Sequence, residues 1–149
     1  MAFGVTVNRR AGSAMLQDPR TEWDEALAIW FREQYELYEN PIAGGSTFFD
    51  HWRQPAMRLN LNLLSRVYDQ GLSIDGAQLG ELLEELRHLE AYWKTCDFSD
   101  CEPLLYTEIG EKAHEGRLVP MEEHLFERLG YLREAIQVAR KHDAVLSVG

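Results

Sequence analysis

The strongest hydrophobic pattern in the chain is an apolar stripe between residues 79 and 96. Its members follow one another at steps of three or four residues, the spacing of a helix face that packs against other helices. The stripe consists of Leu79, Leu82, Leu86, Leu89, Trp93 and Cys96. The charged side chains between them are mostly acidic. The pattern predicts a helix that begins after Ser73 or Asp75 and ends near Thr95.

A second stripe of the same kind predicts a helix from about Pro120 to Lys141. Its apolar members are Met121, Leu125, Leu129, Leu132, Ile136 and Ala139. The segment closes on Arg140, Lys141 and His142. Positive charge at this end complements the helix dipole, which supports the position of the C-terminus.

Two other segments are predicted to be helical on weaker patterns. The first starts at Asp18 or Thr21 and stops by Asn40, since proline follows at the next position. Its apolar face is Trp23, Leu27, Trp30, Phe31, Leu37 and Tyr38. The other, residues 103–115, is a short helix that stops at Gly116.

The region after residue 45 is less uniform. A helix is predicted to begin near Ser46 or Thr47, and Pro55 should kink or break it because proline has no N–H to donate. Residues 57–64 fit either a strand, because polar and apolar side chains alternate, or a helix. The helix is the favoured interpretation because the neighbouring elements are helical, and Gly71 is a natural C-terminal stop.

The two ends of the chain carry weak strand patterns. Residues 2–8 alternate apolar and polar positions, and residues 143–149 are rich in β-branched side chains. Either the two segments pair as a short ribbon, or 1–17 is an arm and 143–149 a tail. The predicted fold is therefore mainly α: a single domain over residues 1–149, an antiparallel bundle of four long helices plus a short one, with at most a minor two-stranded ribbon from the termini.

Composition narrows the classes of function. The chain has 149 residues and a formal net charge of −10. Nucleic-acid and anionic-membrane binding are disfavoured, because such surfaces need basic groups that displace counterions. There is no secretory signal pattern and no apolar run long enough for a membrane span. With only Cys96 and Cys101 as cysteines, a cytoplasmic protein is expected.

Two patterns resemble metal or redox sites and are not assigned as such. Glu85 and His88 have the Glu-x-x-His spacing of di-iron bundles. The leucine stripe places His88 on the outer helix face and Glu85 on its flank, whereas a metal site in a bundle core needs both groups to point inward. Cys96 and Cys101 are spaced too widely for a thioredoxin-like pair and no second ligand pair completes a zinc set. We therefore predict no metal, no cofactor and no catalytic residue.

One segment qualifies as a small-molecule pocket. Gly44 and Gly45 precede a helix start, where backbone N–H groups can hold an anion. The residues that follow offer hydroxyl, acid, base and aromatic groups: Ser46, Thr47, Asp50, His51, Trp52 and Arg53. The alternative interpretation is a flexible turn with a helix cap, because the P-loop lysine and spacing are absent.

Acidic side chains on the predicted helices suggest a different function. The partner-binding candidates are Glu81, Glu84, Glu85, Glu90, Glu122, Glu123 and Glu127. Acidic groups in the middle of a helix are not explained by the helix dipole, and an acidic surface accelerates docking of a basic protein. The leading prediction is a small interaction protein rather than an enzyme, for example an inhibitor or immunity-type protein that neutralises a basic toxin. The alternatives are a ligand-binding or catalytic bundle with its site around residues 44–53, and a homodimer joined through the leucine stripe.

Overall fold

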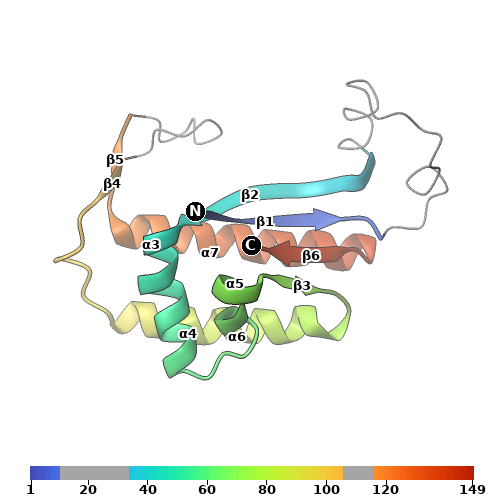
Figure 1. Cartoon of the computed structure of the whole chain (residues 1–149), viewed down its shortest axis with the longest axis horizontal. Coiled ribbons are helices and arrows are strands. Elements are labelled where there is room, and N and C mark those ends of the chain that lie inside the picture. Colours follow the sequence, from blue (N-terminus) through green and yellow to red (C-terminus); the bar gives the residue numbers. More distant parts are fainter. Residues whose placement is uncertain (11–33, 106–115) are drawn as a thin grey trace.

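A four-stranded antiparallel sheet forms one layer of the protein (Figure 1). The computed structural model describes residues 1–10, 34–105 and 116–149. The sheet order is β2-β1-β6-β3, and each pair of neighbours runs antiparallel. The strands are β1 (Ala2–Asn8), β2 (Glu36–Gly44), β3 (Leu72–Ile74) and β6 (Val145–Val148). The two chain ends therefore meet at the centre of the sheet.

The alternating side chains of the central strands explain why they form a sheet. In β1, Phe3, Val5 and Val7 are buried while the residues between them are partly exposed. In β6, Leu146 and Val148 are buried in the same way. Side chains of a strand alternate between two faces, so these apolar groups all point to one side, where they join the core.

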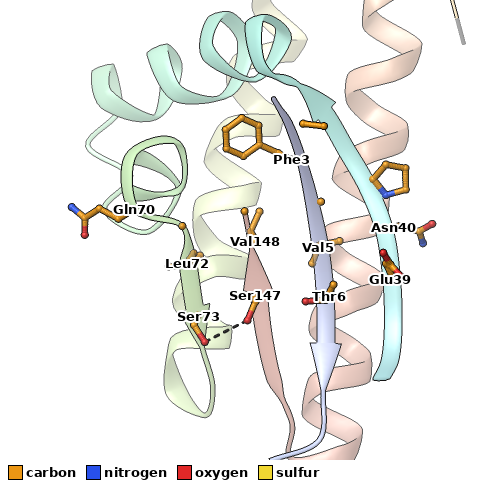
Figure 2. A pocket seen from close by; sticks show the side chains of 15 residues that line it. Phe3, Val5, Thr6, Glu39, Asn40, Gln70, Leu72, Ser73, Ser147 and Val148 are labelled. Atoms are coloured by element: carbon orange, nitrogen blue, oxygen red, sulfur yellow. Dashed lines mark hydrogen bonds between the residues drawn. The ribbon is translucent and has the colours of Figure 1, made fainter. Parts of the chain in front are cut away.

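Two long helices form the second layer. They are α6 (Ala77–Thr95) and α7 (Met121–His142), and Figure 2 shows them behind the strands. The helix α7 packs against β1 and β2, and α6 packs against α7. Both helices confirm the predicted stripes: Leu79, Leu82, Leu86, Leu89 and Trp93 are buried in α6, and Leu125, Leu129, Leu132, Ile136 and Ala139 are buried in α7.

An irregular helical segment closes one end of the sheet. It runs through α3 (Gly45–Phe48), a π-helical turn (Phe49–Arg53) and α4 (Gln54–Arg58) without a break at Pro55. Proline removes the N–H that would bond to the carbonyl four residues earlier, which belongs to His51. The indole N–H of Trp93 donates to that carbonyl at 3.0 Å instead. The helix therefore continues through Pro55 and the predicted break is wrong, whereas the irregularity expected there is present as the π-helical turn directly before the proline.

The predicted helical bundle is wrong. The termini do pair, with Val5 opposite Val148, but they form the middle of a larger sheet rather than a minor ribbon. Residues 36–40 lie in β2 and not in a helix, because their backbone pairs with β1. Residues 34 and 35 are helical, as predicted, and residues 18–33 of the first predicted helix lie outside the described residues.

Two further predicted helices are corrected by the structure. Residues 57–64 are neither one helix nor a strand: α4 ends at Arg58, a turn follows, and α5 (Leu64–Gln70) begins at the end of that range. Asn60, with a φ of 56°, interrupts the helical path. The described part of the expected helix at 103–115 is instead β4 (Leu104–Leu105), which pairs with β5 (Leu118–Val119) in a short ribbon.

None of the helices in the described regions is both long and apolar enough to cross a bilayer.

Candidate functional site

The two long helices run antiparallel, which separates the acidic residues proposed to bind a partner. A Cβ placed on Gly80 would lie 3.3 Å from the Arg140 guanidinium, and Trp93 stacks edge-on against Phe126. The start of α6 therefore lies beside the end of α7. As a result, Glu81 and Glu84 lie at one end of the helix layer, and Glu122 and Glu123 at the other. These carboxylates do not form one surface.

The acidic residues in the middle of the helix layer are compensated. Glu90 accepts from Arg133 at 2.6 Å and from Lys94 at 3.3 Å. The hydrogen bond from Arg133 is the main reason why the pKa of Glu90 lies below its ordinary value. Glu127 accepts from the Tyr131 hydroxyl at 3.2 Å and lies 3.6 Å from the guanidinium of Arg128. The Glu90–Arg133 pair joins α6 to α7, whereas the contacts of Glu127 lie within α7, and little of the charge of either carboxylate is left for a partner.

Glu85 has a structural role that the sequence did not show. Its carboxylate accepts the backbone N–H groups of Leu63 and Leu64 at 2.9 to 3.0 Å. These N–H groups open α5, and the residue at its N-cap supplies no side-chain bond. Glu85 therefore caps a neighbouring helix, where a negative charge is favourable. His88 is exposed, and the described residues contain no group of three or more side chains arranged to hold a metal.

The predicted pocket segment is packed into the protein. Trp52 is fully buried, stacks on Phe48 and meets Trp93 edge-on. The Arg53 guanidinium lies over the rings of Phe49 and Tyr68 at 5.1 and 5.3 Å.

The polar members of the same segment do not converge. His51 is half-buried, and loss of solvation lowers its pKa, so the ring is neutral at pH 7. Ser46 and Asp50 are exposed, and Thr47 is partly buried. None of Ser46, Thr47, Asp50, His51, Trp52 and Arg53 lines either of the two cavities described below.

The larger cavity, about 1150 Å³, lies over the sheet face opposite the helices (Figure 2). Its floor carries small side chains from three strands, including Thr6, Ser73 and Ser147. The two serine hydroxyls lie 3.4 Å apart. Among the described residues that line it, Glu39 is the only one with an acidic or basic side chain.

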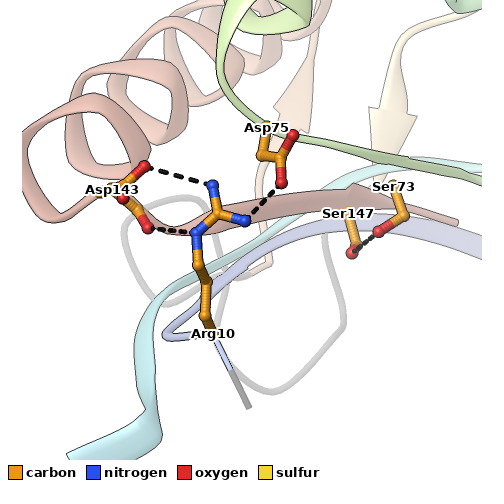
Figure 3. Close-up of polar contacts among 5 residues, drawn as sticks. All are labelled: Arg10, Ser73, Asp75, Asp143 and Ser147. Carbon is orange, nitrogen blue, oxygen red and sulfur yellow. Dashed lines mark hydrogen bonds and ion pairs between the residues drawn. The ribbon is translucent and has the colours of Figure 1, made fainter. Parts of the chain in front are cut away.

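Just after the end of β1, Arg10 forms ion pairs with Asp75 and Asp143, a cluster that we call the clamp (Figure 3). The Arg10 guanidinium donates to the Asp75 carboxylate at 2.6 Å, and to the carboxylate and the carbonyl of Asp143 at 3.2 and 3.0 Å. Asp75 precedes α6 and Asp143 ends α7. The clamp joins the end of β1 to both helices, and each of its groups is used within the protein.

The smaller cavity is a groove located where α6 ends and α7 begins. This groove, of about 470 Å³, lies between the loop after α6 and the first turn of α7. Most of its lining is apolar: Cys96, Phe98, Cys101, Pro103, Pro120 and Met121. Both cysteines are free, and the Cys96 thiol donates to a carbonyl of its own helix. Asp97 and Glu122 add a carboxylate on each side of the groove.

The acidic residues that line this groove, together with those next to its lining residues in the sequence, form a group that we call the acidic end. It consists of Asp97, Asp100, Glu102, Glu122 and Glu123, all exposed. Within the described part of the chain, none of them takes part in an ion pair. Asp97 accepts the Ser99 backbone N–H at 2.9 Å, which holds its pKa below the ordinary value and keeps it ionised at neutral pH. Segments 96–105 and 116–123 contain one basic residue, Arg117.

Only two members of the acidic end, Glu122 and Glu123, are among the partner-binding residues predicted from the sequence. Asp97, Asp100 and Glu102 lie in a loop, where no periodic pattern shows which residues they will approach. The sequence feature that could have identified them is the excess of acidic over basic residues in segment 96–105. Comparison of the chain with protein-family models, with curated proteins and with solved structures gives no match.

Proposed function

We propose that this protein is an interaction module that binds a basic protein partner. The observation that carries the proposal is the uneven distribution of uncompensated charge. Carboxylates in the middle of the helix layer have cationic or hydroxyl partners, whereas those of the acidic end have no ion pair among the described residues. Like charges held close together repel one another and are stabilised when a basic surface approaches. The acidic end therefore attracts a basic partner and accelerates its association.

A small inhibitor is the concrete form of this proposal. A compact acidic chain that neutralises a basic toxin, such as a nuclease, needs a charged docking surface and no catalytic group of its own. The net charge of −10 and the groove beside unpaired carboxylates support this form. Among the described residues that line the two cavities there is no histidine or lysine to act as general base, which favours binding over catalysis.

Affinity capture from an extract of the native host tests the proposal. The tagged chain should retain a protein of basic isoelectric point at about 50 mM salt and lose most of it at about 300 mM, where screening shortens the range of surface charges. Glu122→Gln with Glu123→Gln should reduce the capture severalfold. The matched control, Glu39→Gln with Glu81→Gln, removes the same charge elsewhere and should retain it. Equal losses in both variants, or captured proteins that are not basic, would contradict the proposal.

A further inference from the structure

The short ribbon next to the acidic end has an unusual exposed face. In the register of β4 and β5, Leu104 lies opposite Val119, and Leu105 opposite Leu118. Val119 is fully buried and Leu104 packs against the core, so this pair faces inward. Leu105 and Leu118 face the other way and are 56% and 63% exposed.

Two prolines extend this outer face. Side chains two residues apart along a strand lie on the same side, so Pro103 continues the side of Leu105, and Pro120 that of Leu118. Continuing the register by one position places the two prolines opposite each other. Both are exposed, and both line the groove. We call Pro103, Leu105, Leu118 and Pro120 the ribbon face; it leads from two exposed leucines directly into the groove.

We infer that the ribbon face and the groove together dock a segment of a basic protein in which apolar and basic side chains alternate. This inference rests on the proposed function and specifies its surface. Paired exposed leucines on a two-stranded ribbon are costly in water unless another surface covers them. The carboxylates of Asp97 and Glu122 lie at the groove, within reach of arginine or lysine side chains from the same segment.

Charge decides between a basic partner and a second copy of this chain. Two copies docked through their ribbon faces would bring two acidic ends together, and like charges across an interface oppose association. A basic segment instead meets carboxylates that have no ion-pair partner within the described chain. Burial of its apolar side chains against Leu105 and Leu118 contributes to the binding affinity. Its cationic side chains favour binding at this end of the molecule.

Titration with synthetic peptides, followed by nuclear magnetic resonance of the whole chain, tests the inference. One peptide of about six residues alternates leucine with arginine, a length that spans such a ribbon. A second alternates serine with arginine, and a third leucine with uncharged citrulline. We expect the leucine–arginine peptide to shift the amide signals of residues 97–105 and 117–123. It should bind about tenfold more tightly than either of the other two.

Matched variants separate the apolar contribution from the charge. Leu105→Ser with Leu118→Ser should remove the preference for leucine over serine in the peptide. Met57→Ser with Leu59→Ser, which changes exposed apolar groups elsewhere, should leave that preference intact. Both double variants change exposed side chains, and their thermal unfolding shows directly whether each one is folded.

The other outcomes overturn the inference in distinguishable ways. If both arginine peptides bind equally and only the Glu122→Gln, Glu123→Gln variant weakens them, a basic partner is still favoured but the ribbon face is not its contact. If neither arginine peptide binds at about 20 mM salt, the proposed function fails as well. If the citrulline peptide binds as tightly as the arginine peptide, the partner is apolar. If light scattering shows a dimer that Leu105→Ser, Leu118→Ser abolishes, the occupant is a second copy.

Discussion

Replacing Glu85 should destabilise the protein although the residue lies on the outer flank of α6. Its carboxylate accepts two backbone N–H groups at the start of α5, those of Leu63 and Leu64. Loss of an N-terminal cap costs about 1 kcal/mol, and loss of a negative charge at a helix N-terminus costs a further ~0.3–1 kcal/mol. The two donors are partly buried, so water replaces the carboxylate incompletely. We expect Glu85→Ala to lower the free energy of unfolding by about 2 kcal/mol.

Thermal and urea unfolding measure this effect. For a domain of this size, about 2 kcal/mol lowers the melting temperature by about 4–8 °C. Glu85→Gln should lose about half as much, because the amide oxygen still accepts a hydrogen bond. Glu81→Ala is the control: it is one turn earlier on the same helix, exposed, and has no hydrogen bond or ion pair with the described residues. If Glu85→Ala and Glu81→Ala have equal effects, the cap contributes nothing and the reasoning is wrong.

Three further results are expected. Trp93→Phe should cost about 1–3 kcal/mol of unfolding free energy, because the His51 carbonyl loses its indole donor; a cost no greater than that of shortening a buried ring that makes no hydrogen bond would refute this. Glu90→Gln should cost about 0.5 kcal/mol at pH 7, because the pair is partly exposed. The pKa of Glu90 is lowered in the folded state, so this contribution is present above the ordinary value of 4.5 and vanishes as the pH falls through the folded pKa. Asp100→Asn with Glu102→Gln should leave unfolding unchanged within about 0.5 kcal/mol and still weaken capture of a basic partner severalfold; unchanged capture would contradict the acidic end.

The two long helices could be predicted from the sequence because their determinants are local. Burial of a face recurs every three to four residues, so Leu79 to Trp93 shows the inner side of α6 without knowledge of what covers it. The stripe also placed His88 outside, as the structure confirms. The capping role of Glu85 was not predictable, since its two donors belong to a segment more than twenty residues earlier in the chain.

The sheet could not be predicted, because its pairings join distant segments. Leu37 and Tyr38 fit the apolar face of a helix, yet β2 takes strand geometry from its backbone bonds to β1. Val5 and Val148 pair across almost the whole chain. Alternation in residues 2–8 indicated a strand, but no local pattern specifies how many partners a strand will have. Tertiary pairing outweighed helical propensity here.

The charges of the acidic end have different effects on the stability of the fold and on the binding of a basic partner. Glu122 and Glu123 lie in the first turn of α7, where the helix dipole favours them, and they would be expected there without any partner. Asp97 closes a turn by accepting the Ser99 N–H. Asp100 and Glu102 have neither role, and as exposed groups in a loop beside other carboxylates they add repulsion to the folded state. Since nothing in the described fold requires these two charges, the effect of removing them on capture, at constant stability, is the most direct measure of whether this end of the protein binds a basic partner.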